Sequence, residues 1–82
     1  MRGRKVYLKS SELHLLKPGE YTNADGIWYA VPPNSPDLLA NLSKHQVVEH
    51  EDGTLSVSPS ILVSNSSGSW HGYLERGIWR DC

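Results

Sequence analysis

The chain has 82 residues, with 8 Lys and Arg against 9 Asp and Glu, and a formal net charge of −1. This length accommodates one domain, residues 1–82, with a small core. The charge balance supplies no positive field to hold a phosphate backbone, so nucleic acid is not an expected partner. The single cysteine excludes an internal disulfide and favours a reducing compartment.

The N-terminal region shows neither a leader nor an anchor pattern. No charged-then-apolar segment precedes the first predicted strand, and the apolar runs are too short to cross a bilayer. We therefore predict a cytoplasmic protein without a membrane partner. Arg2 and Arg4 begin the chain, and we interpret residues 1–4 as a flexible, solvated tail.

The region before residue 34 predicts two strands separated by turns. The segment KVYLKSSEL alternates weakly in hydropathy, which favours a strand. Pro18-Gly19 and Asp25-Gly26 follow, and both pairs are typical of turns because glycine tolerates positive φ. The β-branched and aromatic run IWYAV then predicts a second strand. It ends at PPN because proline donates no ladder hydrogen bond.

The segment SPDLLANLSKH, residues 35–45, contains the one predicted helix. Ser35 is a suitable N-cap and Pro36 suits the first helical position. An acidic residue near the start favours the positive end of the helix dipole. The predicted apolar face consists of Leu38, Leu39 and Leu42.

The C-terminal half predicts two hairpins. QVVEHEDGTLSVSPSILV indicates one hairpin around Asp52-Gly53, and WHGYLERGIWR indicates another with its turn at Arg76-Gly77. The elements together predict a mainly β, small α+β fold. We expect a twisted antiparallel sheet or partly open small barrel of about five or six short strands with one short helix. Exposed edges of such a sheet need cover, and a homodimer joined through edge strands is one way to supply it.

Two candidate zinc ligands lie on the final hairpin. Its turn brings Cys82 back towards His71, and thiolate and imidazole are ligands that zinc prefers. A structural site normally needs four ligands, and no CxxC pair supplies the others. His50 or His45 would have to complete the site. Zinc at His71, Cys82 and His50 therefore stands as an alternative to a chain without a cofactor.

No catalytic constellation is apparent in the sequence. Cys82 with His71 pairs a thiol with a base, but a nucleophile there has no following structure to shape an oxyanion hole. The serines include no GxSxG elbow. The acidic residues beside Asp52 are typical of a solvated turn. We expect a binding protein rather than an enzyme.

The aromatic residues are three Trp and four Tyr, with no Phe. This usage fits amphipathic positions, with one edge of the ring buried and the other wet, as protein interfaces use them. The candidate binding residues are Trp70, Tyr73, Trp28 and Tyr29. For Trp28 and Trp79 the competing interpretation, packing in a small core, is the stronger one.

The segments GIWYAVPPN, EHEDGTLSVSPSIL and WHGYLERGIW resemble a group of short proteins of unassigned function in bacteriophages and prophages, some labelled ammonia monooxygenase. The chain is more distantly similar to a broader phage-associated domain with a zinc-binding pattern. There Pro59-Ser60-Ile61 matches a strand motif, and His71 and Cys82 match two of the ligands. Trp70 stands where that domain has a ligand cysteine.

The resemblance implies a small phage or prophage accessory protein in the host cytoplasm. With the aromatic usage, it predicts binding of a host or phage protein through the C-terminal hairpin. One alternative is a zinc-binding domain, with hydrolytic chemistry at an open coordination position. A further alternative is a small ligand such as a nucleotide signal, held by aromatic stacking and loop amides.

Overall fold

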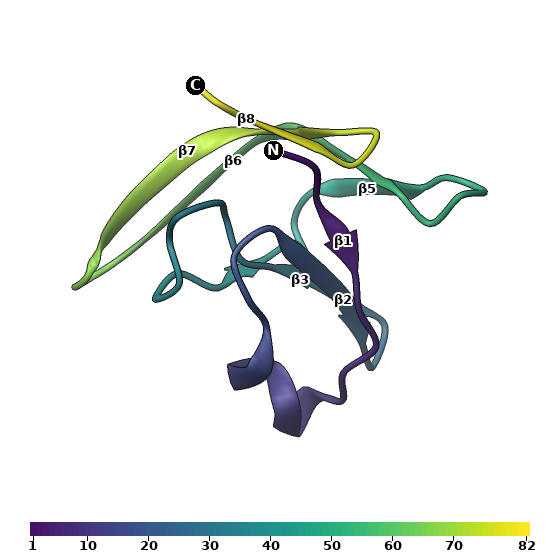
Figure 1. The fold of residues 1–82 in the computed structure, drawn as a ribbon, viewed down its shortest axis with the longest axis horizontal. Coiled ribbons are helices and arrows are strands. Elements are labelled where there is room, and N and C mark those ends of the chain that lie inside the picture. The colour runs from purple at the N-terminus through teal and green to yellow at the C-terminus, as the bar shows by residue number, and fades with distance from the viewer.

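The computed structural model describes all 82 residues. It contains two four-stranded sheets, and the second arches over the first (Figure 1). The strand orders are β1-β2-β3-β4 and β5-β6-β7-β8, and neither sheet closes on itself. The predicted mainly β class is confirmed. The eight strands form two sheets, however, where the sequence predicted five or six strands in one.

The first sheet contains β1 (Arg4–Lys5), β2 (Glu20–Ala24), β3 (Ile27–Ala30) and β4 (Ala40–Asn41). The predicted turn at Asp25-Gly26 joins β2 and β3, and these residues have φ of 54° and 85°. Positive φ at both central positions is typical of a two-residue hairpin turn. β1 runs parallel to β2, whereas β4 is antiparallel to β3.

The strand predicted over residues 5–13 is wrong beyond Lys5. A 3₁₀ helix, η1 (Ser10–Leu15), occupies much of the segment. The Glu12 carboxylate accepts the Lys9 N–H at 2.8 Å, and the Glu12 N–H donates to the Lys9 carbonyl at 2.8 Å. This reciprocal pair satisfies the first turn locally and overrides the weak strand pattern. No helix in the structure is long and apolar enough to span a bilayer.

The helix predicted over residues 35–45 is also wrong. This segment makes a turn and then β4, because its apolar residues alternate instead of following a helical face. Leu38, Ala40 and Leu42 are buried, while Leu39 is 42% exposed. A period of two is the burial pattern of a strand, and Ala40 pairs with Ala30 of β3.

The second sheet contains β5 (Gln46–Glu49), β6 (Leu55–Asn65), β7 (Gly68–Glu75) and β8 (Ile78–Asp81). Both predicted hairpins are confirmed. Glu49 pairs with Leu55 across the Asp52-Gly53 turn, and β7 meets β8 across Arg76-Gly77. The β6–β7 register shifts between residues 57 and 61, so β6 is irregular there.

Residues 1–4 are not a solvated tail. The Gly3 N–H donates to the Gly77 carbonyl at 2.6 Å, and the Trp79 N–H donates to the Met1 carbonyl at 2.8 Å. Arg2 also forms a bridge with Ile78. The N-terminal segment therefore runs along β8 and links its edge to the first sheet, with the two termini on the same side of the molecule (Figure 1).

The core lies between the sheets. Tyr21 of β2 and Leu55, Leu74 and Trp79 of the second sheet are each at most 2% exposed. The Trp79 indole N–H donates to the Gly19 carbonyl at 3.0 Å, so this side chain fills the core and bonds across it. Burial of these apolar side chains is the main force that holds the sheets together.

Candidate binding face on the C-terminal hairpin

Strict alternation along β7 divides the C-terminal hairpin into two faces. Trp70, Gly72 and Leu74 point inward and are buried, whereas His71 and Tyr73 point outward. Side chains three positions apart in a strand lie on opposite faces. The structure therefore separates Trp70 from Tyr73.

Trp70 belongs to the core. It is 8% exposed, and its ring packs edge-on against Trp79 with centroids 5.4 Å apart. Its indole N–H donates to Asp81 Oδ1 at 3.1 Å. Gly72 leaves the space for this ring, because a Cβ there would lie 2.5 Å from Trp70. The predicted binding surface that combined Trp70 with Tyr73 is therefore corrected to the outward residues.

The outward face of β6, β7 and β8 carries three exposed apolar side chains. Leu62 is 68% exposed, Ile78 is 39% exposed and Tyr73 is 38% exposed. Tyr73 is paired with Arg80, whose guanidinium lies 5.5 Å from the centre of its ring. Arg80 also forms an ion pair with Glu75. We call Leu62, Tyr73, Ile78 and Arg80 the outward face.

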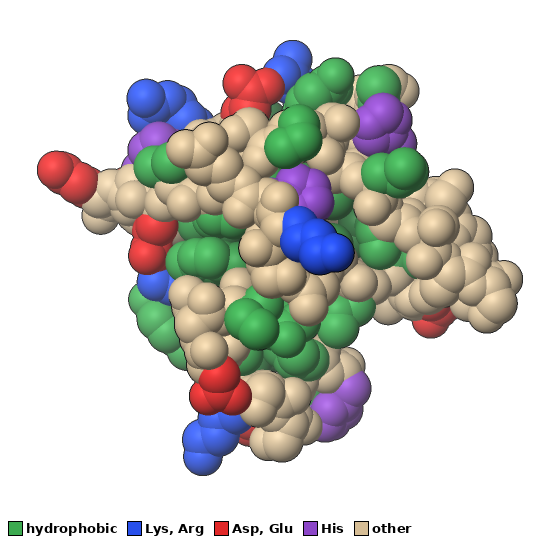
Figure 2. All heavy atoms as spheres, turned by 180° about the vertical axis from the view of Figure 1, so that it is seen from behind, with side chains coloured by type: hydrophobic (Ala, Val, Ile, Leu, Met, Phe, Trp, Pro, Cys, Tyr) green, Lys and Arg blue, Asp and Glu red, His purple; other side chains and the backbone are tan.

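Exposed apolar side chains also occur elsewhere on the molecule. Seen from behind, they form small groups among charged and histidine side chains (Figure 2). Such scattered groups are ordinary for a protein surface. The outward face differs because its apolar residues come from three adjacent strands that the core already holds in place.

The structure brings together two of the predicted zinc ligands. The Cys82 N–H donates to the His71 carbonyl at 2.9 Å, so the two residues lie opposite each other on adjacent strands. His50 lies at the β5–β6 end of the sheet, where its Nε2 is 2.8 Å from Ser56 Oγ. No three His, Cys, Asp or Glu side chains gather in a way that could hold a metal ion. Zinc binding at these residues stays a prediction.

Two histidines contact Ser60, in the irregular part of β6. His71 Nε2 lies 2.9 Å from Ser60 Oγ, and His45 Nε2 donates to the Ser60 carbonyl at 3.2 Å. Nδ1 of His45 is buried without a hydrogen-bond partner. A serine beside a histidine becomes a nucleophile only with an orienting group and oxyanion donors. We infer that the contacts of His45 and His71 with Ser60 hold β6 in place where its register shifts.

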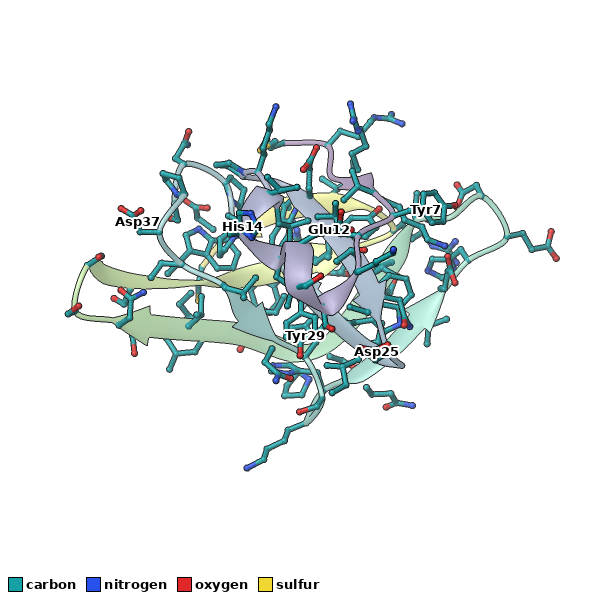
Figure 3. The ribbon with its side chains drawn as sticks, turned by 90° about the horizontal axis from the view of Figure 1, so that it is seen from below. Tyr7, Glu12, His14, Asp25, Tyr29 and Asp37 are labelled. Carbon is teal, nitrogen blue, oxygen red and sulfur yellow. The ribbon has the colours of Figure 1, made fainter.

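The other predicted binding residues, Trp28 and Tyr29, lie on the first sheet. Trp28 packs against the core and meets Tyr21 edge-on at 6.4 Å, and Tyr29 is half-buried on the opposite face of β3. Figure 3 shows Tyr29 near the middle of the first-sheet side and Tyr7 toward the β5–β6 end. The structure does not bring these residues into one surface with Tyr73.

Sequence reasoning missed a charged contact between the sheets. Lys5 Nζ lies 2.5 Å from Glu49 Oε2, 4.9 Å from the Tyr7 ring centre and 5.6 Å from that of Trp28. The hydrogen bond to Glu49 raises the pKa of Lys5 above its ordinary value of 10.5. An open hollow of about 490 Å³ lies beside this pair, and most of the residues that line it are charged or polar.

The surroundings of two further groups near this end of the sheets shift their pKa values. Burial raises the pKa of the Tyr21 hydroxyl above its ordinary value of 10.0. The Thr54 hydroxyl and N–H donate to Asp52 Oδ1 at 2.7 and 3.0 Å, and these bonds lower the pKa of Asp52. These hydrogen bonds stabilise the β5–β6 turn. Asp52 therefore has a structural role in a turn, which is the role that the sequence indicated.

Comparison of the chain with protein-family models, with curated proteins and with solved structures gives no match. The function of the chain is therefore inferred from its own residues. Among the predicted protein-binding residues Trp70, Tyr73, Trp28 and Tyr29, Tyr73 is the one that lies exposed on the C-terminal hairpin.

Proposed function

We propose that the protein acts by binding another protein through the outward face, with Tyr73 at its centre. The observation that carries the proposal is the exposure of Leu62, Tyr73 and Ile78 on strands whose inward side chains already fill the core. Each of these residues keeps more than a third of its surface exposed, and binding would remove this apolar area from water.

The chemistry of the face supports a protein partner. Tyr and Arg are enriched among the residues that dominate binding energy at protein interfaces. The Tyr73 ring lies beside the Arg80 guanidinium, which limits the rotamer freedom that binding would remove. A sheet face without a cavity suits a protein better than a nucleotide, which needs a concave site.

The cellular setting of this proposal comes from the sequence resemblance. We propose a phage or prophage accessory protein that works in the host cytoplasm, with a host or phage protein as the partner. The near-zero net charge of −1 agrees with recognition by shape and apolar contact rather than by a strong field.

The test compares two exposed tyrosines. Tyr73→Ala should weaken binding to the partner, once isolated from infected or lysogenic cells, at least about tenfold. Tyr7→Ala removes the same side chain from a more exposed position, 83% against 38%, outside the outward face. It should leave the affinity unchanged. Equal losses in both variants, or no loss in either, would contradict the proposal.

Zinc binding is a second candidate, and the hydrogen bond between Cys82 and His71 favours it by holding two ligand types side by side. Native mass spectrometry of untagged protein should then show a zinc increment that Cys82→Ser removes. A metal-free spectrum in the presence of added zinc would eliminate this candidate.

A further inference from the structure

The two edges of the second sheet differ in what covers them. Residues 1–3 lie along the β8 edge and bond to Gly77 and Trp79. β5 forms the other edge. An uncovered edge presents a row of unpaired N–H and C=O groups, and it is a template for a further strand.

The free groups of β5 follow from its pairing with β6. The His50 N–H donates to the Thr54 carbonyl at 2.8 Å. Hydrogen-bonded pairs alternate along an antiparallel ladder, so Val48 also exchanges bonds with β6. Val47 and Glu49 therefore direct their N–H and C=O groups away from the sheet. No backbone group elsewhere in the chain bonds to them.

We infer that β5 of a second copy of this chain pairs with β5, antiparallel and about a two-fold axis at Val48. In this register the unpaired N–H and C=O groups of Val47 form hydrogen bonds with those of Glu49 in the second copy. Glu49 likewise bonds with Val47 of the second copy. All the free groups of the strand are then bonded. If the register shifts by two residues in either direction, some of the unpaired backbone groups of β5 have no partner in the second copy. One of these shifts also places the two Glu49 side chains opposite each other, where like charges are unfavourable.

The side chains of β5 agree with this register. Val48 is 48% exposed, and at the axis it would pack against Val48 of the second copy. On the other face Glu49 would lie opposite Val47, and Lys5 already neutralises its carboxylate at 2.5 Å. A net charge of −1 adds little repulsion between two copies. This self-complementarity identifies a second copy as the occupant.

The first test uses matched charges on the outward-pointing side chains. Val48→Lys places two ammonium groups at the axis and should weaken dimerisation by at least about tenfold. Leu39→Lys introduces the same side chain at a similarly exposed position, 42% against 48%, directly before β4 of the first sheet. It should leave the sedimentation equilibrium unchanged. Equal weakening by the two variants would overturn the inference.

The second test reads the register directly. Residues facing each other in a non-hydrogen-bonded pair have Cα atoms about 4.5 Å apart, within disulfide reach. In a Cys82→Ser background, Val48→Cys should form a covalent dimer on oxidation. Gln46→Cys should not, because it would face His50 of the second copy. Reversed crosslinking overturns the register.

A wild-type chain that stays monomeric across the micromolar to millimolar range, with no Val48→Cys crosslink, overturns the whole inference. The β5 edge would then be free for a strand from a different protein. Both tests are independent of partner binding, because none of the variants used here changes a residue of the outward face.

Discussion

The inward and outward faces of the β7–β8 hairpin use aromatic residues in opposite ways. Inward, Trp70 and Trp79 fill the core, and each indole N–H finds an acceptor within the chain. Outward, Tyr73 contacts Arg80 and remains exposed. An amphipathic ring therefore does not by itself indicate an interface, because a small core can satisfy its polar edge. The position of the residue in the strand decides which use applies.

The largest effect should come from the inward face. Trp79→Ala removes a side chain that is 2% exposed and takes from the Gly19 carbonyl one of its two donors, leaving the Arg4 N–H. We expect the free energy of unfolding to fall by about 3–5 kcal/mol, a large share of the stability of so small a domain. Urea unfolding followed by circular dichroism measures it. A loss below about 1 kcal/mol would mean that the two faces do not differ as described.

Gly72→Ala should have the next largest effect. A Cβ at this position would lie 2.2 Å from the Arg80 carbonyl oxygen and 2.5 Å from the Trp70 ring. Backbone must move to admit it, so we expect a loss of about 1–3 kcal/mol in urea unfolding. Gly26→Ala is the control, since it meets no atom within 4 Å but has φ of +85°. If the control loses more, backbone conformation rather than crowding limits the hairpin.

Tyr73→Ala tests the outward face of the β7–β8 hairpin. Because the Tyr73 side chain is 38% exposed and lies outside the core cluster, we expect the free energy of unfolding to fall by only about 1 kcal/mol. The same variant should fail in the binding test described above. A stability loss as large as that of Trp79→Ala would show that the outward ring is structural.

The smallest effect concerns the acidic turn that joins β5 and β6. The pKa of Asp52 is lowered from 3.8 by the Thr54 donors, so the folded state holds this carboxylate ionised more readily than the unfolded state does. Its contribution to stability is present above the unfolded pKa and is lost as the pH falls through the folded one.

Wild type should therefore exceed Asp52→Asn in stability at neutral pH, and the difference should shrink as the pH falls below 3.8. Urea unfolding at several pH values measures this difference. Glu51→Gln removes the same charge from the same turn without touching the Thr54 bonds. An identical pH dependence in both variants would assign the effect to net charge.

The hairpins were predictable because their signals are local. Asp25-Gly26, Asp52-Gly53 and Arg76-Gly77 each lie at a turn in the structure. The opposite orientation of Trp70 and Tyr73 was also encoded, since an odd spacing in a strand places two side chains on opposite faces. That pattern could have shown that the two residues do not share a surface.

Other features depend on contacts between distant residues. Leu38, Leu39 and Leu42 fit a helical face, whereas Leu38, Ala40 and Leu42 fit one face of a strand. Only the pairing of Ala40 with β3 decides between the two. The pair of Lys5 with Glu49 joins residues 44 positions apart, and neither residue type indicates its partner. Tertiary context overrode local propensity in these places.

The N-terminal segment along β8 also constrains the order in which the chain can fold. Gly3 bonds to Gly77, so its partner lies almost a full sequence length away. During synthesis on the ribosome this segment stays unpaired until β8 has emerged. The β2–β3 hairpin can form earlier, because its two strands are adjacent in the sequence. Contacts of such long sequence separation slow folding. The N-terminal segment therefore covers the β8 edge late in folding. Until then both edge strands of the second sheet, β5 and β8, lack a neighbouring strand, whereas in the folded protein only β5 does.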